Sequence, residues 1–215
     1  MMEIRHISLS YGSRTLAQDI SFRAAGGECL LLAGPNGSGK TSLLNLLARQ
    51  PHTVMIPTGI PKVKGFTVEE FIRTGCYRES NWAGRLSDET GRRIAAAMKL
   101  LQLAALRLRD LSTLSDGEFQ KACIAVGLAR CAHVLLLDEP TAYLDVDNRQ
   151  MVLQTLQSVS RETGAAVLFS SHDLHESLAV ADRVLAFTPS GTFLESNRDN
   201  RQDVLHAAFP MYNDL

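Results

Sequence analysis

The segment GPNGSGKT, residues 34–41, constrains the fold of this 215-residue chain more than any other. It follows the apolar run ECLLLA and precedes a helix-like run at 41–48, so it matches the pattern GxxxxGK[ST] between a strand and a helix. Its glycines let the backbone curl so that successive N–H groups point inward at a phosphate. Lys40 can reach the β- and γ-phosphate oxygens, and the Thr41 hydroxyl can bind Mg²⁺. The segment therefore predicts a phosphate-binding loop.

Short apolar runs alternate with longer helical patterns along the chain, which is typical of an α/β domain with a largely parallel sheet. Continuous apolar runs suit strands that helices bury on both faces, and alternating runs suit an antiparallel pair. The continuous runs lie at 28–33, 134–138 and 166–170, and the alternating runs at 3–10 and 16–22. Helices are expected at 41–48, 68–74, 88–100, 118–130, 146–161 and 174–181.

Two further segments complete this organisation. The stretch 67–113 is helical and is expected to be a subdomain inserted ahead of the run VLLLD. The stretch after residue 187 predicts a short hairpin followed by an amphipathic helix.

A second anion site is predicted at LSDGE, residues 114–118. A serine, a glycine and free backbone amides at a helix start favour the binding of an anion. The helix that follows places Phe119, Ala122, Cys123 and Val126 at i, i+3, i+4, i+7 spacing, which marks a buried face. The sequence thus predicts two phosphate-binding segments.

The run VLLLDE ends in two acids, Asp138 and Glu139. Ligands of open α/β sheets bind at the carboxyl ends of the strands, where these acids would lie. Asp138 can hold the Mg²⁺ shell, and Glu139 can orient or deprotonate an attacking water. Two acids after a strand are common at protein surfaces, but beside a phosphate-binding loop they indicate a catalytic site.

His172 and Tyr11 are two further candidates. His172 follows the apolar run at 166–170, so it is expected at the same sheet edge as Lys40 and Glu139, where it could donate to a γ-phosphate. Tyr11 could stack on a base, although ordinary packing explains a loop tyrosine as well.

Composition excludes several classes of protein. The net charge is −1, which does not favour binding to nucleic acid or anionic lipid. The four cysteines have no CxxC spacing, so they predict neither a disulfide frame nor a zinc site. The N-terminus lacks the apolar core of a secretory signal, and the apolar runs are too short to span a bilayer.

Together these motifs resemble those of the ATPase subunits of ABC transporters. GPNGSGKT is similar to the Walker A motif, VLLLDEP to Walker B, AYLD at 142–145 to the D-loop, and LSDGE to the signature LSGGQ. The resemblance implies a P-loop NTPase fold, in which helices flank a mostly parallel α/β sheet. It also implies a reduced antiparallel β subdomain and an inserted α-helical subdomain at about 67–113, within a single ABC ATPase domain at 1–215.

The resemblance also implies roles for individual residues, with ATP and Mg²⁺ as cofactors. Lys40, Glu139 and His172 would be catalytic, and Thr41 and Asp138 would hold the metal. In this family the signature completes the ATP site of a facing subunit in a homodimer, so Ser115 and Gly117 would act on the second chain's ATP. The nucleotide-binding residues would be Tyr11, Gly34, Asn36, Gly37, Ser38, Gly39, Lys40, Thr41, Ser42, Ser115 and Gly117.

Within the family, TVEEFIRTGCY and NWAGRLSDET resemble importer ATPases for iron–siderophore, haem and cobalamin uptake. The implied partners are transmembrane permease subunits and an external substrate-binding protein, with no nucleic acid. The implied location is the inner face of the cell membrane, in the cytoplasm.

The chain departs from the family where a glutamine normally contacts Mg²⁺ and links ATP to the membrane subunit. That place falls at Thr58 or Gly59, neither of which has an amide side chain. Three interpretations follow: water or Thr58 replaces the contact, the chain is a paralogue that hydrolyses ATP slowly, or it is a degenerate copy. The intact set of motif residues argues against the third.

Two other functions compete with ATP-driven transport. A non-transport ABC ATPase acting on nucleic acid or ribosomes usually has two fused cassettes or a coiled-coil insert, which this chain lacks. A different P-loop enzyme, such as a kinase or GTPase, would leave LSDGE without a role, and the NKxD motif of base recognition is absent.

Overall fold

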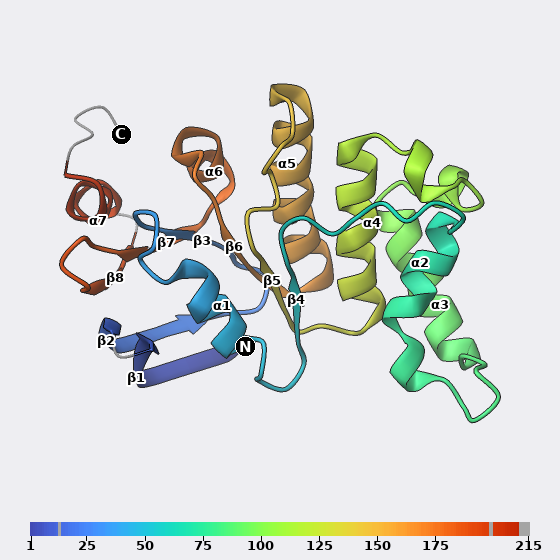
Figure 1. Cartoon of the computed structure of the whole chain (residues 1–215), viewed down its shortest axis with the longest axis horizontal. Coiled ribbons are helices and arrows are strands. Elements are labelled where there is room, and N and C mark those ends of the chain that lie inside the picture. The colour runs from blue at the N-terminus through green and yellow to red at the C-terminus, as the bar shows by residue number, and fades with distance from the viewer. Residues whose placement is uncertain (13, 198–199, 211–215) are drawn as a thin grey trace.

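The computed structural model describes residues 1–12, 14–197 and 200–210; for Tyr11 and Arg14 it describes the backbone alone. Its centre is a six-stranded sheet in the order β4-β5-β6-β3-β7-β8 (Figure 1). All neighbouring strands are parallel except β7 and β8, which form a hairpin. The strands are β3 (Cys29–Ala33), β4 (Thr53–Ile56), β5 (Val134–Leu137), β6 (Ala166–Ser170), β7 (Arg183–Phe187) and β8 (Phe193–Glu195).

A second, two-stranded sheet pairs β1 (Met2–Tyr11) with β2 (Arg14–Ala24) in antiparallel register, Met2 facing Ala24. Both strands alternate apolar and polar residues, because one face packs on the core while the other is solvated. The antiparallel pair expected at 3–10 and 16–22 is therefore confirmed, with each strand longer at both ends.

The helices lie close to their expected ranges. A capping serine, threonine or aspartate precedes α2 to α6, and its side-chain oxygen accepts a backbone N–H of the first turn. The helices are α1 (Lys40–Leu47), α2 (Val68–Gly75), α3 (Asp88–Leu100), α4 (Asp116–Ala129), α5 (Val146–Thr163), α6 (Leu174–Val180) and α7 (Arg201–Ala208). Three short 3-10 helices are η1 (Tyr77–Glu79), η2 (Ala104–Leu106) and η3 (Leu111–Thr113).

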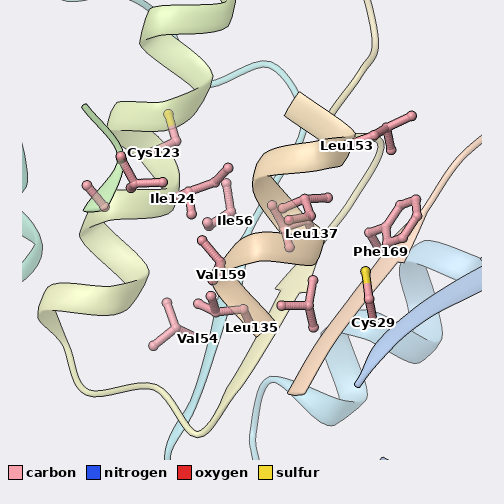
Figure 2. Close-up of a cluster of buried hydrophobic side chains, with 14 of the residues drawn as sticks. Cys29, Val54, Ile56, Cys123, Ile124, Leu135, Leu137, Leu153, Val159 and Phe169 are labelled. Atoms are coloured by element: carbon pink, nitrogen blue, oxygen red, sulfur yellow. The ribbon is translucent and has the colours of Figure 1, made fainter. Parts of the chain in front are cut away.

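Alternate residues of the central strands form two cores, one on each face of the sheet. Figure 2 shows the first core, where Leu135, Leu137 and Phe169 lie with side chains of α4 and α5 such as Ile124 and Val159. The second core places Leu30, Leu32, Leu136 and Leu168 against α1 and the β1–β2 sheet. Burial on both faces explains why these strands read as continuous apolar runs.

Two strands of the central sheet, β4 and β7, were not predicted from the sequence. β4 is four residues long and lies between Pro51 and Pro57, and a run of that length gives no usable periodicity. The chain passes from α1 through residues 48–52 directly into β4, so nothing is inserted at that point. Its position is set by its pairing with β5 rather than by its own composition.

The helices α2 and α3 lie beyond α4 at one end of the molecule, and α7 lies at the other (Figure 1). Helix α4 packs against both α2 and α3 and also against α5 and β4. Its face with Phe119, Ala122 and Cys123 is buried as expected, whereas Val126 is half-buried. No helix in the described ranges is both long and apolar enough to cross a membrane.

All four cysteines have free thiols, as the sequence predicted. Cys29, Cys76 and Cys123 are buried, and Cys131 is exposed.

Candidate functional site

The loop between β3 and α1 has the backbone that its glycines allow. Gly34 has φ of 144°, and a Cβ atom there would lie 2.9 Å from Ser38 Oγ and 2.9 Å from Phe187 Cβ. Gly39, directly before α1, has φ of 109°. A Cβ atom on Gly39 would lie 2.8 Å from a methyl group of Leu9. Side chains at these two positions would meet both steric clash and backbone strain. The loop therefore depends on both glycines for its shape.

Lys40 is buried at the first position of α1. Its Nζ donates to the carbonyl oxygens of Gly34 (2.8 Å) and Pro35 (3.2 Å), which ties the side chain across the loop. Burial lowers the pKa of Lys40, while the carboxylates of Glu139 and Asp138 oppose that shift. Lys40 has no ion-pair partner among the residues that the structure describes, so its buried ammonium is suited to an anionic ligand that would supply the opposite charge.

Asp138 follows β5 and is bonded through both carboxylate oxygens. Thr41 Oγ1 donates to Asp138 Oδ2 (2.8 Å), and Ser170 Oγ donates to Asp138 Oδ1 (2.7 Å). The same Ser170 hydroxyl accepts the backbone N–H of Glu139 at 2.9 Å. Ser170, at the end of the neighbouring strand β6, therefore holds both acids in place. Sequence reasoning missed it, although its place at the carboxyl end of a buried strand was a signal.

Glu139 has φ of 48°, a left-handed conformation that a non-glycine residue rarely adopts. Its carboxylate is in contact with Nε2 of His172. Such a conformation persists only where neighbouring bonds hold it, and it is enriched at functional sites. The structure thus brings together Glu139 and His172, which lie 33 positions apart in the sequence.

Lys40, Thr41, Glu139 and His172 line a cavity of about 330 Å³ at the carboxyl edge of the sheet. Ser38 stands in the same loop between the lining residues Gly37 and Gly39, and its hydroxyl is buried and has no hydrogen-bond partner among the described residues. A buried hydroxyl without a partner is costly unless a ligand satisfies it. The cavity is lined by Leu16, Asn36, Gly37, Gly39, Lys40, Thr41, Ser42, Glu139 and His172.

Thr58 lies two residues after β4, at the place where the resemblance implied a glutamine. Its hydroxyl donates to the main-chain oxygen of Asp138. The contact joins the segment after β4 to the acids after β5. Thr58 does not line the cavity itself.

Ser115 and Gly117 begin α4, away from this cavity. Ser115 Oγ accepts the N–H of Glu118 (3.1 Å), and the Glu118 carboxylate accepts the N–H of Ser115 (2.8 Å), which is a capping box. A Cβ atom on Gly117 would lie 2.4 Å from Asn148 Oδ1 and 2.3 Å from Met151 Cε, so α5 packs directly on this glycine.

The sheet order separates the strands next to the two predicted phosphate-binding segments. Helix α4 packs on β4, whereas the phosphate-binding loop follows β3, and β5 and β6 lie between them. At the usual spacing of strands, β3 and β4 are about 14 Å apart. Neither Ser115 nor Gly117 lines the cavity, so the structure does not bring them to the loop of their own chain.

The remaining candidate, Tyr11, ends β1, and its side chain lies outside the described part of the structure.

Comparison with known proteins accounts for this set of motifs. The family model described as "ABC transporter" matches residues 17–142. The chain belongs to the ABC transporter family. It is 31% identical over 209 residues to the petrobactin import ATP-binding protein FpuC of Bacillus anthracis, covering 86% of this chain and 77% of that protein. It is 33% identical over 192 residues to the zinc import ATP-binding protein ZnuC of Roseobacter denitrificans, covering 86% and 74%.

Solved structures of ABC transporters share the fold. An inward-facing ABC transporter described as of the metal-chelate type has a TM-score of 0.85 at 24% identity, with 97% of this chain and 88% of that chain covered. A nucleotide-free ATP-binding cassette has a TM-score of 0.81 at 19% identity, with 99% and 100% covered. These likenesses confirm the expected P-loop NTPase fold and, with the family match, an ATPase subunit of an ABC transporter.

Proposed function

We propose that this chain binds and hydrolyses ATP as the motor of an ABC importer. The observation that carries the proposal is the convergence of Lys40, Thr41, Glu139 and His172 on one cavity, with Asp138 bonded to Thr41 behind it. This is the set that phosphoryl transfer to water requires: a phosphate cradle, a metal-binding pair and a base.

The residues present fit both ATP and Mg²⁺. The unpartnered Ser38 hydroxyl and the buried Lys40 ammonium suit a triphosphate. No group of three or more metal-ligating side chains exists among the described residues, but Mg²⁺ at ATP sites needs only one or two protein ligands beside phosphate and water. Thr41 and Asp138, already 2.8 Å apart, would supply them. Bound there, the ion would neutralise charge on the phosphate oxygens.

Glu139 would take a proton from the attacking water. His172, paired with Glu139 through Nε2, would keep the carboxylate oriented towards the cavity and offer a donor to the terminal phosphate. Ser170 would position both acids through its two hydrogen bonds.

The active form would be a homodimer. Ser115 and Gly117 begin a helix whose amides are suited to phosphate, yet they lie away from their own loop. A C₂ dimer would place the signature of each copy over the cavity of the other, so that two ATP sites form from two chains.

A permease would dock on the helical region at 67–113. Large apolar side chains stand exposed there and just before it: Tyr77 is 71% and Trp82 is 99% exposed, and Phe66 and Val63 are partly so. A groove of about 300 Å³ lies among them, lined by Phe66, Arg73, Tyr77 and Leu86 with their neighbours. Exposed apolar side chains around a groove are typical of a protein-binding surface. The chain would then work at the cytoplasmic face of the membrane, with a substrate-binding protein on the other side.

The transported substrate would be an iron chelate. Relatives named for petrobactin and iron(3+)-hydroxamate import support this class. Relatives named for zinc import are about as similar, which makes zinc the second candidate. Accumulation of radiolabelled ferric chelates and of zinc, in cells with and without the chain, separates the two.

The experiment that tests ATP hydrolysis is Glu139→Gln. The amide keeps the size of the side chain but cannot accept the proton, so turnover should fall about a hundred-fold or more while ATP binding persists. Turnover of the purified chain with MgATP is measured beside Glu162→Gln, which removes an exposed carboxylate of α5 and should leave turnover unchanged. Wild-type turnover in Glu139→Gln would refute the assignment of Glu139 as the general base. A wild-type chain that binds ATP but hydrolyses it very slowly would favour the slow paralogue.

A further inference from the structure

The signature of this chain carries an extra acid that the structure pairs with a lysine. Asp116 is the first residue of α4, directly after Ser115. Lys62 Nζ donates to Asp116 Oδ1 at 2.6 Å and to the main-chain oxygen of Leu114 at 2.8 Å. The same ammonium lies 5.8 Å from the centre of the Phe119 ring. Lys62 therefore contacts residues on both sides of Ser115 as well as the first turn of α4.

Lys62 comes from the segment 57–66, which joins β4 to α2 and passes the start of α4 (Figure 1). At its beginning, Thr58 donates to the main chain of Asp138. At its end, the Gly65 N–H donates to Asp110 (2.7 Å), and the Phe66 carbonyl accepts the N–H of Leu111 (2.9 Å). The segment is thus bonded to the catalytic edge of the sheet at one end and to the residues before α4 at the other.

The charge of Asp116 bears on any phosphate that approaches Ser115. A carboxylate in the first turn occupies the positive end of the helix and repels a triphosphate. Its side chain is 64% exposed, so its charge is not shielded by burial in the protein. The second acid of the signature, Glu118, is already directed back to the Ser115 N–H by the capping box. Asp116 is the acid that needs a countercharge, and Lys62 supplies it.

We propose that Lys62 is a positioning residue for the ATPase reaction. It neutralises Asp116 and fixes the start of α4, so that Ser115 and Gly117 can receive the triphosphate held by a second copy of this chain. The inference rests on the proposed function, because it assumes that the signature acts across a dimer. It goes beyond that function in assigning a role to a lysine outside the nucleotide cavity.

A double-mutant cycle tests the role of the charge. Lys62→Met should raise the KM for ATP about five-fold with a smaller effect on kcat, which is the size of effect expected for one partly exposed ion pair. Asp116→Asn alone should change KM little, and Lys62→Met with Asp116→Asn should return KM to near the wild-type value. The deficit of Lys62→Met should shrink as salt is added. Lys62→Arg should behave as wild type.

Two controls separate the charge from other effects. Lys64→Met removes an exposed lysine from the same segment and should leave KM unchanged. Binding of ATP to each variant at concentrations too low for dimers should equal that of the wild type, because Lys62 does not line the cavity. If Lys62→Met is too unstable to assay, Lys62→Gln keeps most of the side-chain stem and an amide donor for Leu114 while removing the same charge.

Several outcomes would overturn the proposal. If Asp116→Asn fails to rescue Lys62→Met, then Lys62 acts through packing or by direct contact with phosphate. If Lys64→Met raises KM equally, the effect depends on the total charge of the segment 57–66 rather than on the contact between Lys62 and Asp116. A wild-type chain whose ATPase rate does not rise cooperatively with ATP would instead refute the dimeric function on which the proposal rests. The dependence of the wild-type ATPase rate on ATP concentration therefore distinguishes failure of the dimeric function from failure of the Lys62 proposal before any variant is measured.

Discussion

At the scale of single residues, two serines near the proposed nucleotide cavity have hydroxyls in opposite situations. Ser170 is a buried serine and Ser38 a half-buried one, and their hydroxyls differ. Ser38 Oγ has no partner among the described residues, whereas Ser170 Oγ joins Asp138 to the backbone of Glu139. The free-energy cost of the unpartnered Ser38 hydroxyl is expected to be recovered when ATP binds. The hydrogen bonds of Ser170 support the site whether or not ATP is bound.

The two serines therefore predict opposite effects of the same substitution. Ser38→Ala should raise the free energy of unfolding of the nucleotide-free chain by roughly 1 kcal/mol and weaken ATP binding. Ser170→Ala should lower it by about 1–3 kcal/mol, because the Glu139 N–H and an Asp138 oxygen lose their partner. Urea unfolding with and without MgATP measures both. A loss of stability in Ser38→Ala would contradict the account of the unpartnered hydroxyl.

Most residues of the cavity could be predicted from the sequence, because the motif spacing fixes them relative to the strands. Lys40, Asp138 and His172 each follow a strand that ends at the same sheet edge. The contacts of Thr58 and Lys62 could not be predicted. They depend on where the segment 57–66 runs in space, and nothing in its composition indicates that path.

At the scale of elements, α4 is the helix that packs between α5 and β4 on one side and α2 and α3 on the other. Its approach to α2 is unusually close at Gly75, where a Cβ atom would lie 2.3 Å from Cγ1 of Val126. The sequence predicted both helices to within two residues, because each has a capping residue and an apolar face. It did not predict that Gly75 would set the distance between them.

This contact predicts how much stability is lost when a small side chain is added at Gly75. Gly75→Ala should lower the free energy of unfolding by about 1–3 kcal/mol, since the added methyl group forces the helices apart. Gly75→Ala in a Val126→Ala background should cost less than it does in the wild type, because the clashing methyl group is gone. Urea midpoints of the two single variants and the double variant test this. Equal costs in both backgrounds would mean that the helices do not meet at this point.

At the scale of the whole molecule, the core that Figure 2 shows buries two thiols whose titration couples folding to pH. Burial raises the pKa of Cys29 and of Cys123 to about 12, from an ordinary value of 9.0. The folded chain then keeps protons that the unfolded chain releases above pH 9. The contribution of these thiols to stability is therefore complete below pH 9 and is lost as the pH rises towards 12.

The chain is accordingly expected to lose stability between about pH 9 and about pH 10.5, with each thiol contributing up to about 1.4 kcal/mol per pH unit. Lys40 acts in the opposite direction, because burial lowers its pKa. Cys29→Ala removes one of these thiols. The variant should have a lower urea midpoint than the wild type near pH 8, because it leaves a small cavity. Its urea midpoint should then fall less than that of the wild type as the pH is raised. An unchanged drop would contradict the assignment.

The central claim at this scale is that each ATP site is built from two copies of the chain, whose mass is 23.5 kDa. Lys40→Ala disables the phosphate-binding loop, and Ser115→Arg disables the signature. If the site is shared, each variant lacks half of both sites in its own homodimer. A mixed dimer contains one site with neither defect, because the intact loop and the intact signature come from different chains.

Sedimentation of the two variants in a Glu139→Gln background tests this directly. Each alone should remain at the mass of one chain when ATP is added, and the mixture should give a species of twice that mass. Ser87→Arg, which removes the corresponding cap of α3, controls for the loss of a helix cap and should still dimerise. A mixture that stays monomeric with ATP, while Glu139→Gln alone forms the dimer, would contradict the shared site.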